Sequence, residues 1–119
     1  MEDKKTTILI IDDDPDVAAM LKHYLSLRHF SVLTAFRGED ALAVIEKEKV
    51  DLVILDIIMH GIHGLAVAKL IKERHPEIKI IVMTGYPDAG KQIEHEVHLE
   101  GLFFKPEGIQ MLYHKLLAC

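Results

Sequence analysis

Four short apolar runs in the sequence each stop at a residue whose side chain can hold a phosphate group or a metal ion. The polar residues that follow these runs are, in chain order, Asp12, Asp13 and Asp14, then Asp56, then Thr84, and finally Lys105. If the runs are parallel strands of one sheet, their carboxyl ends lie along one edge, where open α/β sheets build their sites. Carboxylates, a hydroxyl and an ammonium group would then share one crevice.

These groups together suit phosphate chemistry with a divalent metal. Carboxylates crowded into one crevice repel one another, and a divalent cation relieves that repulsion. Asp12, Asp13 and Asp56 supply only oxygen ligands, which suit Mg²⁺. The Thr84 hydroxyl and the Lys105 ammonium can hold oxygens of a phosphoryl group placed on a carboxylate beside the metal. Because Asp56 stands alone at its strand end, it is the best candidate for the nucleophile.

Strands and helices alternate along the whole sequence, which predicts five βα units. The expected strands are 8–11, 31–35, 52–55, 80–83 and 102–104. The expected helices are 15 to about 28, 39 to about 49, one through 67–74, a weakly held one anchored by 93 and 97, and a last one through 109–117. Asp14 can cap the first helix with its side-chain oxygen. Pro15 is favoured at the next position, because proline lacks the amide that would be unpaired there.

The expected fold is an α/β three-layer sandwich of the doubly wound, flavodoxin-like (βα)5 type. Three of the strands are apolar at successive positions, as expected when helices cover both faces of a sheet. Right-handed crossovers then favour a parallel five-stranded sheet of order 2-1-3-4-5. In that order the first and third strands are neighbours, so Asp12, Asp13 and Asp56 are expected to meet.

Composition limits the classes of function. The 119 residues predict a single domain, 1–119, without an effector domain. The net charge of −5, without a basic block, argues against direct binding of nucleic acid. No apolar run approaches the ~20 residues that span a membrane, and Met1–Thr7 is too short and polar for a signal peptide. With Cys119 as the single cysteine, a cytoplasmic location is expected.

The motifs together carry a family resemblance that covers the whole chain. In order and spacing, the sequence resembles a response-regulator receiver domain of two-component signalling at Ile8–Pro15, Asp56–Met59, Met83–Gly85 and Lys105-Pro106. The resemblance implies that Asp56 accepts phosphate from a phosphohistidine on a sensor histidine kinase or a histidine phosphotransfer protein. It also implies that Asp13, Asp56 and the carbonyl of Ile58 bind Mg²⁺ directly, with Asp12 acting mainly through water.

The resemblance also assigns the groups that hold the phosphoryl oxygens. Thr84 and the backbone amide of Gly85 would contact them, and Lys105 would pair with their charge. Such a domain is a signalling phosphoacceptor that assists its own phosphorylation and slow dephosphorylation, not an enzyme in the ordinary sense. Its phosphorylation would switch a protein-interaction surface, and the sequence leaves open whether this drives homodimer formation.

The sequence departs from the family pattern at several positions. Leu102 stands three residues before the lysine, where the family usually has the Tyr or Phe that rotates inward on activation. Phe103 and Phe104 are adjacent to it but are expected to point in different directions. His60 stands where many members have a proline, and Glu107 where an aromatic residue often follows. Leu102 and His60 give weight to a second interpretation, an interaction module that keeps the fold but takes no phosphate.

A haloacid-dehalogenase-like phosphatase is the competing enzyme hypothesis. That family places an Asp nucleophile after its first strand in an Asp-x-Asp pattern, which Asp12 and Asp14 satisfy formally. The hypothesis leaves Asp56 without a role, however. The sequence also lacks the acidic pair that those enzymes need, because Glu107 is the only acidic residue after Lys105.

Slow loss of phosphate follows from two residues that flank the expected site. In the family, the positions two residues beyond the phosphoacceptor and two beyond the threonine tune hydrolysis, and here they are Ile58 and Tyr86. Neither side chain readily activates water as a base. Once Asp56 is labelled by a small phosphodonor, the label is expected to persist well beyond seconds. A lifetime of seconds, measured as loss of label with time, would contradict this expectation.

Overall fold

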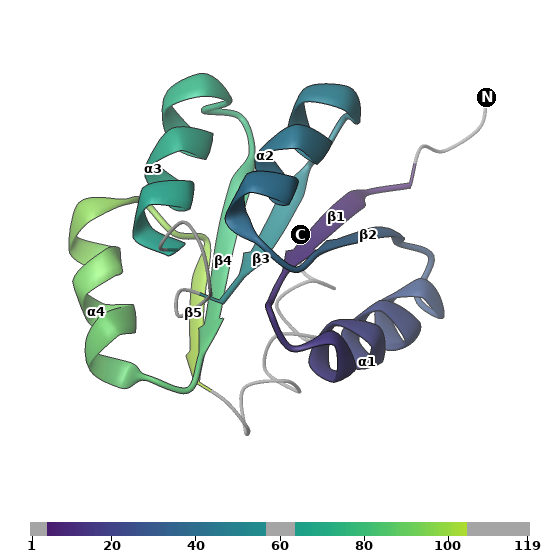
Figure 1. Cartoon of the computed structure of the whole chain (residues 1–119), viewed down its shortest axis with the longest axis horizontal. Helices are drawn as coiled ribbons and strands as arrows, with labels where there is room; N and C mark the ends of the chain where they lie inside the picture. Colours follow the sequence, from purple (N-terminus) through teal and green to yellow (C-terminus); the bar gives the residue numbers. More distant parts are fainter. Residues whose placement is uncertain (1–4, 57–63, 105–119) are drawn as a thin grey trace.

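The computed structural model describes residues 5–56 and 64–104, which form a parallel five-stranded sheet with helices on both faces (Figure 1). The strand order is β2-β1-β3-β4-β5, as predicted. The strands are β1 (Thr7–Ile11), β2 (Ser31–Ala35), β3 (Leu52–Leu55), β4 (Lys79–Thr84) and β5 (Gly101–Phe104). The helices are α1 (Pro15–Ser26), α2 (Gly38–Lys47), α3 (Gly64–Arg74) and α4 (Pro87–Glu96). The helix predicted through 109–117 lies outside the described residues.

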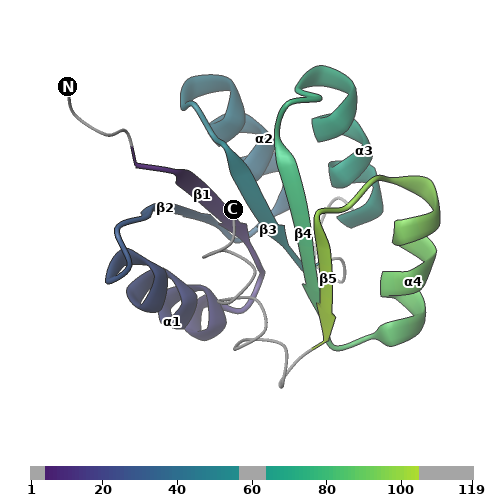
Figure 2. The same cartoon turned by 180° about the vertical axis from the view of Figure 1, so that it is seen from behind.

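Helices α2, α3 and α4 cover one face of the sheet, and α1 lies on the other face (Figures 1 and 2). In strand β1, alternate residues pack into the cores on the two faces of the sheet. Leu9 and Ile11 belong to the cluster under α2, α3 and α4, whereas Ile8 and Ile10 belong to the cluster under α1. Successive side chains of a strand point to opposite faces, so burial on both sides explains the unbroken apolar runs.

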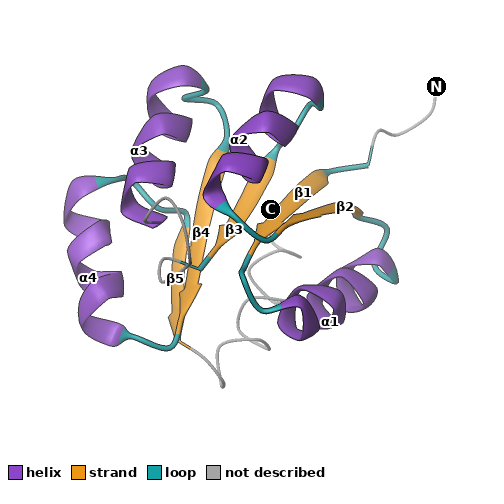
Figure 3. Cartoon of the chain, in the orientation of Figure 1, coloured by secondary structure: helices purple, strands orange, loops and turns teal. Residues whose placement is uncertain are grey.

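Strand–turn–helix connections place the start of each helix at the carboxyl ends of the strands (Figure 3). The predicted cap of α1 is confirmed: the Asp14 carboxylate accepts hydrogen bonds from the amides of Asp16 (2.9 Å) and Val17 (3.4 Å). Pro15 takes the first helical position, where no amide is needed. The end of β1 is therefore tied directly to the start of α1.

Several predicted boundaries shift by one or two residues. Helix α1 ends at Ser26 instead of about Arg28, because the chain turns there and His29 adopts a left-handed conformation with φ of 69°. In α1 the buried apolar side chains are Ala18, Leu21 and Leu25, while Met20 is 46% exposed. Helix α2 ends at Lys47 instead of about residue 49, because Glu48 is already extended on the way to β3.

Helix α4 is held to the sheet by few side chains, as its composition predicts. Gly90 and Ile93 are its buried residues, and Val97, expected inside the helix, is its C-cap. An exposed ion pair, Lys69 Nζ to Glu96 Oε1 at 2.9 Å, joins α3 to α4. Among the described helices, none combines the length and the apolar character needed to cross a membrane.

The left-handed turn at His29 gives a test of the fold. Left-handed backbone costs an L-residue roughly 1–2 kcal/mol, most for side chains branched at Cβ and least for Gly or Asn. His29→Val is therefore expected to lower the free energy of unfolding by about 1–2 kcal/mol. His29→Asn should change it by no more than about 0.5 kcal/mol. Urea unfolding of both variants measures the difference, and equal stabilities would contradict the turn geometry.

Candidate functional site

The register between β1 and β3 brings two carboxylates side by side. Ile11, the last residue of β1, pairs with Leu55, the last residue of β3. The next residues, Asp12 and Asp56, are fixed by backbone hydrogen bonds to the neighbouring strands. The Asp56 amide donates to the Ile11 carbonyl at 2.9 Å, and the Asp12 amide donates to the Ala35 carbonyl at 3.1 Å. Both side chains therefore start from the same edge of the sheet.

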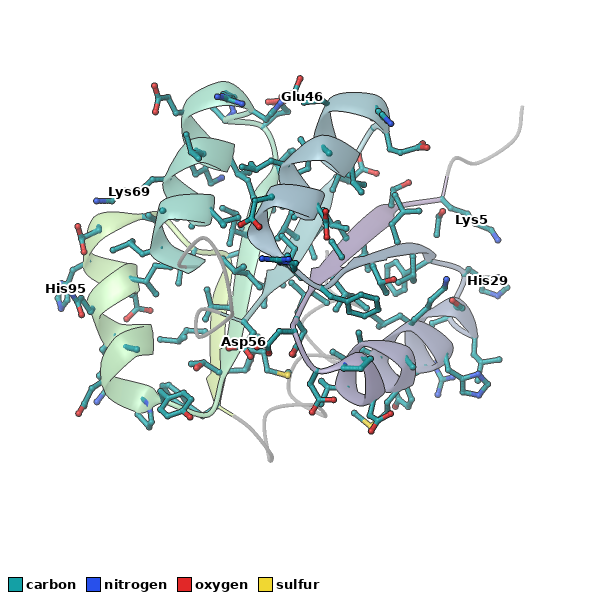
Figure 4. The ribbon with its side chains drawn as sticks, in the orientation of Figure 1. Lys5, His29, Glu46, Asp56, Lys69 and His95 are labelled. Atoms are coloured by element: carbon teal, nitrogen blue, oxygen red, sulfur yellow. The ribbon has the colours of Figure 1, made fainter. Side chains whose placement is uncertain are left out.

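Asp13 completes a cluster of three carboxylates. One oxygen from each of Asp12, Asp13 and Asp56 lies within 4.8 Å of the others. Asp12 is only 3% exposed and its Oδ1 accepts the Asp14 amide at 3.0 Å, while Asp13 and Asp56 are partly open to solvent. Figure 4 shows Asp56 at the carboxyl ends of the strands, at the opposite end of the molecule from Glu46. The predicted meeting of the three carboxylates is confirmed.

This donor set fits Mg²⁺. All three side chains offer oxygen, the ligand type that Mg²⁺ prefers, and partial exposure leaves room for the waters that this ion retains. Carboxylate oxygens this close repel one another, and a divalent cation between them would turn the repulsion into attraction. Asp12, Asp13 and Asp56 are therefore the described residues that would hold such an ion.

Thr84 lies on the next strand, at the same edge. It is the last residue of β4 and is fully buried, at 0% exposure. Leu55 pairs with Val82, so Thr84 stands two residues further along β4 than the end of β3. The Thr84 hydroxyl oxygen accepts the amide of Tyr86 at 3.1 Å. Because a hydroxyl accepts and donates at once, its hydrogen can still be directed to a ligand oxygen.

Gly85 and Tyr86 connect Thr84 to α4. A Cβ built on Gly85 would meet no atom within 4 Å, so this position borders open space. Tyr86 is the N-cap of α4 and is 59% exposed. At Gly85 the loop after β4 therefore leaves its backbone open beside Thr84.

Two predicted site residues, Ile58 and Lys105, fall outside the described ranges. Lys105 directly follows Phe104, which pairs with Thr84 across β4 and β5, but Lys105 lies outside the described residues. Ile58 lies outside them as well. Their roles therefore stay predictions, and the departures from the family pattern at His60 and Glu107 also fall outside.

The side chains of β5 point as their alternation predicts. Leu102 packs against the cluster under α2, α3 and α4, and Phe103 packs against the cluster under α1. The Phe104 ring lies on the same side as Leu102, because both approach Gly90 of α4. Sequence reasoning did not single out Gly90, although a glycine inside a predicted helix was a signal for a close approach.

The fold and the carboxylate cluster at the ends of β1 and β3 together define a flavodoxin-like α/β domain with an acidic cluster consistent with binding of a divalent cation. Residues 8–117 match the family model of the response regulator receiver domain. The chain belongs to this family and is the receiver domain of a response regulator. This assignment favours the phosphoacceptor function over a haloacid-dehalogenase-like phosphatase.

Relatives and solved structures agree with the assignment. The regulatory protein VanR of Enterococcus faecium is 36% identical over 85 residues, which cover 71% of this chain and 35% of VanR. The transcriptional regulatory protein GlrR of Escherichia coli is 36% identical over 92 residues, covering 75% of this chain and 21% of GlrR. The chain thus spans about a third or less of these relatives.

A solved structure gives the likeness in three dimensions. The response regulator TrrA of Thermotoga maritima, crystallised with Mg²⁺ and BeF, is 32% identical, with a TM-score of 0.85. The match covers 95% of this chain and 97% of that one. The fold found here is therefore shared over nearly its whole length with a response regulator that was crystallised with Mg²⁺.

Because the clustered carboxylates repel one another, removing one of them should affect protein stability in opposite directions with and without metal. Asp13→Asn removes one negative charge, so it is expected to raise the free energy of unfolding without metal by about 1 kcal/mol. Saturating Mg²⁺ should stabilise the wild type, because the ion binds the folded state, and should stabilise Asp13→Asn much less. Urea unfolding in chelator and in excess Mg²⁺ measures both effects.

The matched control is Glu73→Gln, an exposed carboxylate near the far end of α3. It should respond to Mg²⁺ like the wild type. Equal Mg²⁺ stabilisation of the wild type and Asp13→Asn would show that the cluster does not bind the ion.

Proposed function

We propose that Asp56 accepts a phosphoryl group from a phosphohistidine on a sensor histidine kinase or a histidine phosphotransfer protein. An Asp56 carboxylate oxygen would attack phosphorus, the bond from phosphorus to the histidine nitrogen would break, and the imidazole would leave with a proton. The observation that carries the proposal is the placement of the carboxylate cluster beside the buried Thr84. The Mg²⁺ and BeF in the crystal of TrrA support the metal-dependent chemistry by analogy.

The position of Asp56 supports its choice as the acceptor. Asp12 is nearly buried and its Oδ1 is engaged by the Asp14 amide, which suits a supporting role. Asp56 follows β3, which lies between β1, the strand before the other carboxylates, and β4, the strand that ends in Thr84. A phosphoryl group on Asp56 would therefore have the metal ligands on one side and the Thr84 hydroxyl on the other.

Each remaining residue has one proposed task. Asp13, Asp56 and the Ile58 carbonyl would hold Mg²⁺ directly, and Asp12 through water. The ion would neutralise charge on the phosphoryl oxygens during transfer. The Thr84 hydroxyl and the Gly85 amide would donate to the same oxygens, and Lys105 would pair with them. Such fixed donors cost no rearrangement at the moment of transfer.

The output of phosphorylation is proposed to be a protein contact. The matched relatives include transcriptional regulators, and the chain covers only 35% of VanR and 21% of GlrR. With a net charge of −5, this domain is unsuited to bind DNA by itself. A change of surface, or a homodimer formed on phosphorylation, is the proposed output, with the domain acting in the cytoplasm.

Labelling with acetyl phosphate and Mg²⁺ tests the proposal. The wild type is expected to gain the mass of one phosphoryl group, and Asp56→Ala is expected to gain none. Asp51→Ala is the matched control, because Asp51 immediately precedes β3 whereas Asp56 immediately follows it. It should be labelled like the wild type. Size-exclusion chromatography of the labelled protein reports self-association at the same time.

Three outcomes would contradict the proposal. A folded wild type that takes no phosphate would favour the interaction module without phosphorylation. Labelling that survives in Asp56→Ala would place the acceptor elsewhere. Turnover of a free phosphate ester that is lost in Asp12→Ala but kept in Asp56→Ala would favour the phosphatase.

A further inference from the structure

Helix α4 packs on the sheet through a glycine. Gly90 is buried in this helix, together with Ile93. A glycine in a helix interior is less favourable than alanine, and the backbone of Gly90 is not in the left-handed region that would require it. The backbone conformation therefore does not require glycine at position 90. The reason for a glycine lies in the space around it.

The space above Gly90 is filled by three side chains of the sheet. A Cβ at this position would lie 3.0 Å from Leu102 Cδ1, 3.2 Å from Thr84 Cγ2 and 3.3 Å from Phe104 Cε1. Each distance is shorter than ordinary van der Waals contact between carbon atoms. Thr84 and Phe104 pair with each other as the last residues of β4 and β5, so two of these atoms come from strand ends at the edge of the sheet that carries the carboxylate cluster. Only a residue without a side chain lets α4 approach so closely.

This contact fixes the hydroxyl of Thr84 as well as its methyl group. Cγ2 and Oγ1 are both bonded to Cβ, so they rotate together, and a side chain branched at Cβ has few allowed rotamers. The methyl group lies against Gly90, and the hydroxyl oxygen accepts the amide of Tyr86, the N-cap of α4, at 3.1 Å. Two contacts with α4 thus determine the χ1 torsion angle of Thr84, whose side chain is fully buried.

We propose that Gly90 is a positioning residue for phosphoryl transfer. Its bare backbone holds Thr84 in the rotamer whose oxygen accepts the Tyr86 amide and whose hydrogen is directed to the phosphoryl group. A methyl group at residue 90 crowds Cγ2, turns the side chain and moves the hydroxyl away from its place. The proposal rests on the function proposed for Asp56 and Thr84, but the positioning itself concerns the protein without phosphate.

Gly90→Ala tests the proposal with two readouts. In the unphosphorylated protein, the amide resonance of Tyr86 in a ¹H–¹⁵N spectrum should shift, because its hydrogen bond to Thr84 is altered. The rate of labelling by acetyl phosphate and Mg²⁺ should fall on the order of fivefold, since a misplacement of about 1 Å can cost roughly 100-fold. Lys91→Ala, an exposed neighbour on the same helix, is the matched control and should change neither readout.

Double variants show whether Gly90→Ala lowers the labelling rate through Thr84 or through Leu102. Thr84→Ser keeps the hydroxyl and removes Cγ2, so adding Gly90→Ala to Thr84→Ser should lower the labelling rate less than twofold below that of Thr84→Ser alone. In Leu102→Ala, which relieves the 3.0 Å contact instead, Gly90→Ala should keep its full effect. Relief by Leu102→Ala and not by Thr84→Ser would overturn the proposal, and so would an unchanged Tyr86 amide.

Urea unfolding keeps the test interpretable. It shows whether each variant is folded, and a Gly90→Ala protein that is folded, labels like the wild type and keeps its Tyr86 amide unchanged would refute the positioning role. If the wild type takes no phosphate, the function proposed for Asp56 fails. The Tyr86 amide of Gly90→Ala in the unphosphorylated protein still decides whether Gly90 positions Thr84.

Discussion

The pairing of β1 with β3 is the constraint on which the site depends. Ile11 and Leu55 end their strands in register, and the backbone bond from Asp56 to Ile11 extends that register by one residue. A slip of one residue would turn every side chain of the strand to the other face of the sheet. Both faces are buried, but under different helices, so the apolar side chains would no longer match their partners. Core packing therefore also fixes the distance between the carboxylates.

Burial of apolar side chains in the sheet offsets the repulsion between the clustered carboxylates. Carboxylates within 4.8 Å of one another disfavour the folded state, and Asp12 is almost withdrawn from water. Immediately below them, Leu9, Ile11 and Leu55 are fully buried, and each such side chain stabilises the fold by about 1.5–3 kcal/mol. The apolar strands thus allow a charged cluster at their ends, and a metal ion bound there would add to stability.

How far the sequence predicts the structure differs from element to element. The strand order and the meeting of Asp12, Asp13 and Asp56 were predictable, because continuous apolar runs and right-handed crossovers leave few arrangements. The early end of α1 was not, since nothing in a pattern of apolar residues indicates that His29 takes a positive φ. A glycine inside a predicted helix indicates a close approach, but its contact with Thr84 was not predictable, because local sequence does not show which side chains of the sheet lie opposite it.

The close approach of α4 also involves the strand where this chain departs from the family pattern, β5. The family usually has, where this chain has Leu102, the Tyr or Phe that rotates inward on activation. Strand alternation, however, puts Leu102 and Phe104 on the same face, and both meet Gly90 together with the methyl group of Thr84. An aromatic ring thus lies against α4 two residues further along β5, beside the strand end that carries Thr84. The missing side chain at residue 90 gives this ring and Leu102 the room to lie against α4.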